Sequence, residues 1–115
     1  MVRTSEEQKV RKANARGGAG EVEMRLLVNG AEELYGKGKL FNHMVMEPGV
    51  SVGLHAHDGD NEIYYILTGA GEYNDNGTIV PVKAGDVCIC NDGEIHALIN
   101  TGSEVMEFIA LVVNS

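Results

Sequence analysis

Residues 53–69, GLHAHDGDNEIYYILTG, place three potential metal ligands on two alternating stretches joined by a turn. His55 and His57 are two positions apart, so on a strand their side chains lie on one face. DGDN at 58–61 is rich in turn formers, and Glu62 opens a run in which Tyr64 and Ile66 share its face. If the two strands meet as a hairpin, two imidazoles and a carboxylate converge, a set that suits a first-row divalent ion.

A second stretch supplies a fourth candidate ligand. Residues 85–100, GDVCICNDGEIHALIN, place His96 after another glycine-containing turn. A single histidine on a strand is more often a packing or surface group than a ligand, and His43, which lies outside both stretches, is interpreted in that way. Two histidines at i and i+2, a nearby glutamate and a third histidine together favour a metal site.

Glycine and asparagine divide most of the chain into short, largely apolar runs of four to eight residues. This spacing predicts many short strands folded as a sandwich or barrel. The run GEYNDNGTIVPV predicts a hairpin in which Asn76 and Gly77 supply the positive φ angles of a type I′ turn. Residues 22–28 alternate as another strand, with Val22, Met24 and Leu26 on one face.

The first twenty residues have a different character. Thr4 or Ser5 can cap a helix with acidic residues in its first turn and basic residues later, before RGGAG interrupts it. We therefore expect residues 1–20 to form a flexible lead or short helix, and residues 21–115 to form a single domain. A chain of 115 residues suffices for one modest core.

Both stretches resemble the conserved motifs of the cupin superfamily. Gly49, His55, His57, Glu62 and Gly69 match every element of the first motif, while Gly85, Gly93, His96 and Asn100 match the second; Asn91 stands where proline is usual, which affects a turn and not a ligand. The likeness covers residues 22–113. It implies an all-β fold, a double-stranded β-helix (jelly-roll) barrel, with a divalent metal ion held inside by His55, His57, Glu62 and His96.

The resemblance leaves the metal and the chemistry open. Zinc, manganese, iron, nickel, cobalt and copper all accept imidazole and carboxylate ligands. The expected function is a small metal-binding cupin with open positions for a small organic ligand, which includes enzymes such as dioxygenases, isomerases and decarboxylases; the alternative is a non-catalytic binding or sensing domain. Tyr64, Cys88 and Cys90 are the candidate proton-transfer groups, and Met44, Met46, Met106 and Phe108 are expected to pack in the walls.

Charge and cysteine content restrict the partners. The net charge of −8 argues against nucleic acid or an anionic membrane as a partner, and no apolar run approaches the roughly 18 residues of a membrane span. Cys88 and Cys90 share a strand face about 6.6 Å apart, too far to bridge each other, so buried, reduced thiols are expected, with metal ligation or redox sensing as alternatives. The N-terminus lacks the apolar region of a secretory signal, which favours a cytoplasmic location.

Basic residues are unevenly distributed, and this bears on the ligand. Eight of the nine Lys and Arg residues lie in residues 1–39, and Lys83 is the only one after them. The barrel is therefore expected to favour a neutral or monoanionic ligand, with Arg25 as the one plausible cation. Exposed strand edges further predict a homodimer, for which the strand at residues 22–28 is the expected donor.

Overall fold

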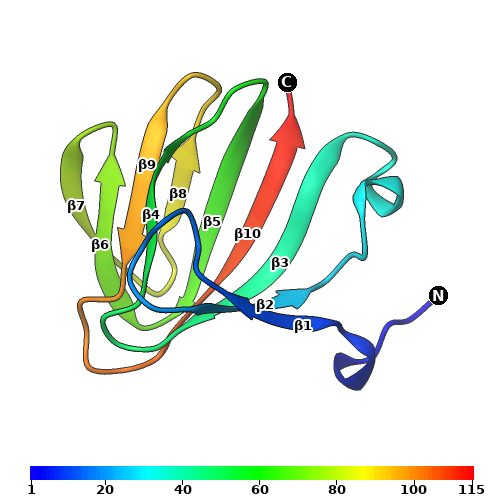
Figure 1. Cartoon of the computed structure of the whole chain (residues 1–115), viewed down its shortest axis with the longest axis horizontal. Coiled ribbons are helices and arrows are strands. Elements are labelled where there is room, and N and C mark those ends of the chain that lie inside the picture. Colours follow the sequence, from blue (N-terminus) through cyan, green and yellow to red (C-terminus); the bar gives the residue numbers. More distant parts are fainter.

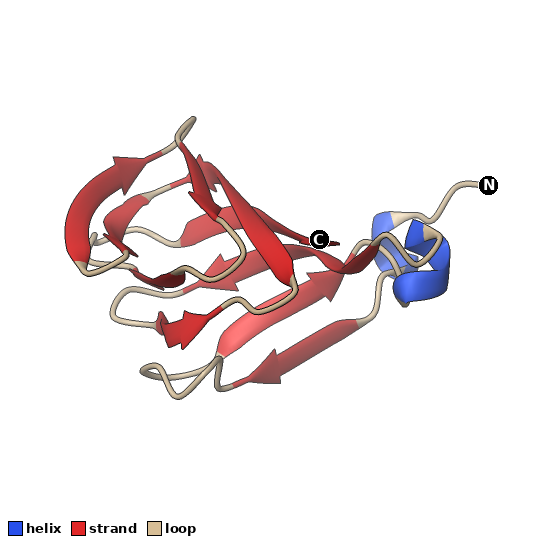
Figure 2. Ribbon diagram, turned by 90° about the horizontal axis from the view of Figure 1, so that it is seen from above, coloured by secondary structure: helices blue, strands red, loops and turns tan.

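Two antiparallel sheets face each other in the computed structural model, which describes residues 1–115 (Figures 1 and 2). One sheet has the order β1-β2-β3-β10-β5-β8 and the other β4-β9-β6-β7. The expected all-β double-sheet barrel is confirmed. The strands are β1 Val10–Ala13, β2 Val22–Leu26, β3 Gly38–Met46, β4 Ser51–Ala56, β5 Asp60–Thr68, β6 Ala70–Asp75, β7 Thr78–Lys83, β8 Val87–Cys90, β9 Ile95–Ile99 and β10 Met106–Asn114.

Helical structure is confined to two 3-10 turns, η1 (Ser5–Glu7) and η2 (Ala31–Leu34). Neither approaches the length and apolar character of a membrane-crossing helix. The chain otherwise turns at positive-φ residues, as expected for closely spaced strands. At the β6–β7 hairpin, Asn76 and Gly77 have φ values of 51° and 97°, which confirms the predicted turn.

The core lies between the sheets and is formed by alternate residues of each strand. Tyr64 and Ile66 on β5 are 2% and 0% exposed, and Met106 and Phe108 on β10 are fully buried beside them. Met44 and Met46 on β3 complete this wall, so the predicted core positions are confirmed. The inward residues of β5 continue toward Glu62, which therefore also points into the barrel.

The N-terminal segment differs from the expected helix or flexible lead. Only residues 5–7 are helical, and β1 pairs antiparallel with β2 to extend the six-stranded sheet. Ala15 is buried and forms a parallel bridge to Val52 of β4. The β1 sequence, VRKA, shows no apolar alternation, and its side chains are mostly exposed. No local pattern therefore predicts this strand, and its pairing depends on a distant partner.

This arrangement also corrects the expected dimer contact. β2 lies between β1 and β3, so both of its edges are already hydrogen-bonded within the chain. The strand at residues 22–28 is therefore not a free edge.

The outer face of the six-stranded sheet is apolar across four strands. One cross-strand row consists of Phe41, Leu111, Ile63 and Ile89, and the next contains Ile109, Tyr65 and Val87. Val87, Ile89 and Tyr65 are 57%, 50% and 46% exposed. Glu107, two residues from Ile109 on β10, is paired with His43 at 2.7 Å. We call the seven residues of these two rows the apolar face.

Candidate metal centre

Four side chains from three parts of the barrel converge inside it: His55 on β4, His57 just after β4, Glu62 on β5 and His96 on β9. Their ligand atoms all lie within 4.8 Å of one another. The antiparallel register places His55 directly opposite His96, after an irregularity between Val52 and His55. The turn at residues 58–59 carries the chain to β5 and brings Glu62 to the same point. The structure thus brings together all four predicted ligands.

Each imidazole is oriented by a partner on its Nδ1 atom. His55 Nδ1 donates to the Gly53 carbonyl oxygen at 2.7 Å. His57 Nδ1 donates to Asp60 Oδ1 at 2.7 Å. His96 Nδ1 lies 2.9 Å from the hydroxyl of Tyr73. All three Nε2 atoms consequently face the centre, which is the arrangement that outer partners impose on metal-binding histidines.

The centre requires positive charge. Carbonyl and carboxylate oxygens only accept hydrogen bonds, so His55 and His57 hold protons on Nδ1 and their neutral forms direct lone pairs inward. Yet His96 Nε2 lies 3.0 Å from His55 Nε2 and 3.1 Å from His57 Nε2. Glu62 Oε1 lies 3.1 Å from His57 and His96 and 3.7 Å from His55. Lone pairs this close repel unless protons or a metal ion lie among them.

The separations fit a divalent ion. Two ligand atoms bound at about 2.1 Å lie about 3.0 Å apart when the bonds are perpendicular and about 3.4 Å apart in a tetrahedron. The shortest separations among the four atoms, 3.0 and 3.1 Å, correspond to perpendicular bonds. Three nitrogen donors and one carboxylate at these separations are consistent with a metal site.

The pKa of Glu62 is governed by burial and by the three imidazoles around it. Burial raises this pKa, but interaction with the imidazoles of His55, His96 and His57 outweighs burial and brings it to about 2. Burial lowers the pKa of His96, which favours the neutral imidazole. For Asp60, burial is outweighed by hydrogen bonds from Lys39 and His57, so its pKa is lowered and it stays ionised.

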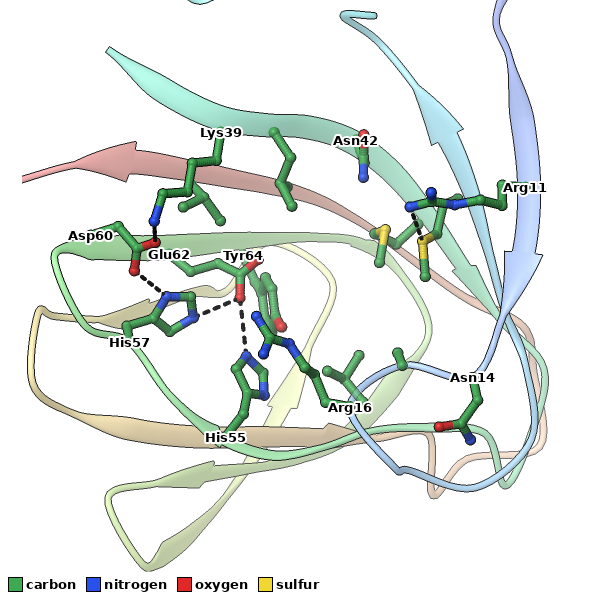
Figure 3. Close-up of a pocket in the computed structure, with 16 residues that line it drawn as sticks. Arg11, Asn14, Arg16, Lys39, Asn42, His55, His57, Asp60, Glu62 and Tyr64 are labelled. Carbon is green, nitrogen blue, oxygen red and sulfur yellow. Dashed lines mark hydrogen bonds and ion pairs between the residues drawn. The ribbon is translucent and has the colours of Figure 1, made fainter. Parts of the chain in front are cut away.

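A cavity of about 360 Å³ opens beside the four ligands (Figure 3). Its apolar lining comes from Met24, Leu40, Met44, Val52 and Val112, and its polar lining includes Asn14, Asn42 and Asp60. Three cations also line it: Arg11, Arg16 and Lys39. The expectation that the barrel offers almost no fixed cation is therefore wrong. Arg11 and Arg16 reach the cavity because the N-terminal segment packs against the barrel, and Lys39 lies on β3.

Arg25, which sequence reasoning singled out as the one plausible cation, lies elsewhere. It does not line the cavity, and its Nε donates to Glu23 at 2.7 Å. Alternation along β2 explains this, since Met24 faces inward and Arg25 therefore faces outward. Lys39, by contrast, donates to Asp60 Oδ2 at 2.6 Å and extends a chain of contacts from Lys39 through Asp60 to His57.

Sequence reasoning missed Asp60 and Tyr73, the outer partners of two ligands. In the sequence, Asp60 is one of the turn formers of DGDN, although its position three residues after His57 is a usable signal. Tyr73 carried no local signal, because it reaches His96 only through the pairing of β6 with β9.

The two cysteines are free and buried on the interior face of β8, as expected from their spacing. Burial, followed by nearby carboxylates, raises the pKa of both thiols to about 11, so they are neutral at pH 7. Burial also raises the pKa of Tyr64, followed by the charge of Glu62. None of the three belongs to the four-ligand group.

The fold and this centre define a class: a small double-sheet β-barrel with a three-histidine, one-glutamate group inside it. Residues 42–113 match the family model described as a cupin domain. The chain belongs to the cupin domain family. It is 50% identical over 113 residues to the oxalate-binding protein of Thermotoga maritima, covering 98% of this chain and 93% of the relative.

Solved structures agree with this assignment. The crystal structure of a predicted oxalate decarboxylase from Thermotoga maritima superposes with a TM-score of 0.95 at 48% identity, with both chains fully covered. An RmlC-like cupin from Shewanella frigidimarina has a TM-score of 0.74 at 15% identity, covering 97% of this chain and 88% of its own. The second likeness shows the fold alone.

Proposed function

We propose that this protein binds one divalent metal ion through His55, His57, Glu62 and His96 and, on that ion, a small carboxylate anion such as oxalate. The observation that carries the proposal is the group of inward-facing lone pairs, which needs a cation at its centre. Support for the ligand comes from the relative at 50% identity, which is named an oxalate-binding protein.

The cavity beside the four residues leaves room for a small anion. An ion held by His55, His57, Glu62 and His96 would offer its remaining positions to carboxylate oxygens. When bound, the ion supplies Lewis acidity that draws carboxylate oxygens to it. The cations around the cavity, Arg11, Arg16 and Lys39, add to this attraction.

Decarboxylation of such an anion is the second candidate function, because a solved relative at 48% identity is described as a predicted oxalate decarboxylase. That reaction needs a group that delivers a proton to carbon as CO2 leaves. Asp60 uses both carboxylate oxygens on Lys39 and His57. Burial raises the pKa of Tyr64 and makes it a poor acid. This arrangement favours binding over turnover.

Elemental analysis of untagged protein tests the metal. We expect one divalent ion per chain in the wild type and its loss in a His55→Ala/His57→Ala variant, with His43→Ala as a control that keeps the ion. His43 is paired with Glu107, away from the centre, so its removal should leave the metal content unchanged. Equal metal content in the wild type and the double variant would refute the site.

Calorimetric titration of metal-loaded protein with oxalate tests the ligand. Binding that disappears when the metal is removed by chelation supports the proposal, whereas no binding by loaded protein contradicts it. Assaying the same mixture for formate and CO2 separates the two candidate functions.

A further inference from the structure

A loop held in one conformation carries a cation to the cavity. In the segment from residue 14 to residue 18, the Asn14 side chain accepts a hydrogen bond from the Gly17 backbone at 2.9 Å and donates to the Gly18 carbonyl at 2.7 Å. It also donates to the Gly20 carbonyl at 3.1 Å. A single amide side chain thus ties together three backbone groups of the loop, which restricts its motion.

The same loop is bound to β4, the strand that carries His55. Gly53 N donates to the Ala15 carbonyl at 2.9 Å, and Ser51 N donates to the Ala19 carbonyl at 3.0 Å. A Cβ atom at Gly53 would collide with the Arg16 carbonyl oxygen, so the two backbones are in direct contact. The loop therefore has a defined position relative to the metal ligands.

Arg16 adopts an unusual backbone conformation within this loop. Its φ is +55°, the left-handed region that an arginine seldom occupies. Such conformations are retained where the surrounding structure holds them in place and are concentrated at functional sites. Here the hydrogen bonds of Asn14 and the contact with Gly53 supply the restraint.

The Arg16 guanidinium has no partner within the chain. Arg3, Arg25 and Lys39 each form an ion pair, whereas no hydrogen bond or ion pair involves the Arg16 side chain. Figure 3 shows this side chain directed into the cavity beside His55, Glu62 and Tyr64. An unpaired cation next to the metal ligands is available for an anion bound there.

We propose that Arg16 binds the outer oxygens of a metal-bound ligand and so makes the site selective for short dicarboxylates over monocarboxylates. This inference rests on the proposed function. The metal ion holds the inner oxygens of the ligand, and the planar guanidinium donates two parallel hydrogen bonds to those facing away from the metal. A monocarboxylate such as acetate has no outer oxygens and gains little from Arg16. Two-point recognition therefore discriminates by the second carboxylate.

Three variants test the inference with Mn²⁺-loaded protein, titrated calorimetrically with oxalate and with acetate. Arg16→Asn removes the charge but retains a residue that tolerates the left-handed conformation. Arg16→Lys keeps the charge but cannot donate the two parallel hydrogen bonds of a guanidinium. Arg25→Asn is the matched control, because this arginine comes from the same half of the chain and faces away from the cavity.

We expect Arg16→Asn to weaken oxalate binding about ten- to hundredfold, the effect of losing hydrogen bonds between charged groups. Acetate binding and Mn²⁺ content should change less than twofold, and Arg16→Lys should be intermediate for oxalate. Arg25→Asn should match the wild type. A merely structural role would instead lower the melting temperature and weaken both anions equally.

The outcomes separate the two proposals. If loaded wild-type protein binds no oxalate, the proposed function fails. If the wild type binds oxalate and Arg16→Asn binds it equally well, the role of Arg16 is refuted while the proposed function stands. If Arg16→Asn is poorly folded, Arg16→Lys decides the question. An unchanged preference for oxalate over acetate in that variant would refute the role of the two parallel guanidinium hydrogen bonds.

Discussion

Replacing Asp60 with asparagine should weaken metal binding without removing a ligand. Asp60 is 6% exposed, and its Oδ1 accepts the hydrogen bond from His57 Nδ1 at 2.7 Å. A carboxylate in this position makes the imidazole a better donor to the metal and fixes its orientation. Asparagine preserves the shape and can still accept this hydrogen bond through its amide oxygen, but it carries no charge.

The size of the effect follows from the lost charge. A buried hydrogen bond to a charged group contributes about 1.5–3 kcal/mol, and one between neutral groups about 0.5–1.5 kcal/mol. The difference of about 1–1.5 kcal/mol corresponds to roughly five- to tenfold weaker binding. The pair between Lys39 and Asp60 adds little to stability, because the lysine side chain is 54% exposed.

Competition with a fluorescent chelator measures this affinity, and circular dichroism verifies the fold of each variant. Asp58→Asn is the matched control, since Asp58 is an exposed carboxylate two residues away. We expect its metal affinity to equal that of the wild type. Unchanged affinity in folded Asp60→Asn protein would show that the carboxylate does not support His57 as argued.

Three further predictions concern the thiols, pH and assembly. A Cys88→Ser/Cys90→Ser variant should keep its metal by elemental analysis, because both thiols lie outside the ligand group; loss of metal from folded protein would place sulfur at the centre. In metal-free protein, Glu62 has a pKa of about 2 against an ordinary 4.5, so the unfolded state takes up a proton first as the pH falls. The free energy of unfolding should therefore decrease between these two pH values. Urea titrations at several pH values should show a weaker pH dependence of this free energy for Glu62→Gln. Light scattering should show a homodimer joined through the apolar face. Although the chain has a net charge of −8, these two rows contain no unpaired carboxylate that would repel a second copy. Ile89→Lys should give monomers and Ile79→Lys, at a similarly exposed position on β7, should not; a monomeric wild type would contradict the assignment.

The four-residue group of the candidate metal centre could be predicted because three of its members lie within eight residues. Strand alternation fixes the shared face of His55 and His57, and the turn that follows brings Glu62 back toward them. His96 required the second motif, since its position opposite His55 depends on pairing between strands about forty residues apart. The general pattern of short strands followed from glycine spacing alone.

The N-terminal segment could not be predicted in the same way. Its helix-capping residues form only a three-residue turn, and β1 shows no apolar alternation. Its contacts with β2 and β4 come from distant parts of the sequence. The low number of cations predicted for the barrel is wrong for the same reason, since Arg11 and Arg16 lie within residues 1–20 and yet line the cavity.

The division of the cavity between two parts of the chain has an evolutionary consequence. The metal ligands lie on β4, β5 and β9 and in the turn between β4 and β5, whereas Arg16 lies on a loop whose own hydrogen bonds determine its shape. On the proposed role of Arg16, substitutions in that loop would alter which anions are accepted while the four barrel residues remain unchanged. Selectivity and metal affinity would then vary independently, through changes at a few positions of an N-terminal loop.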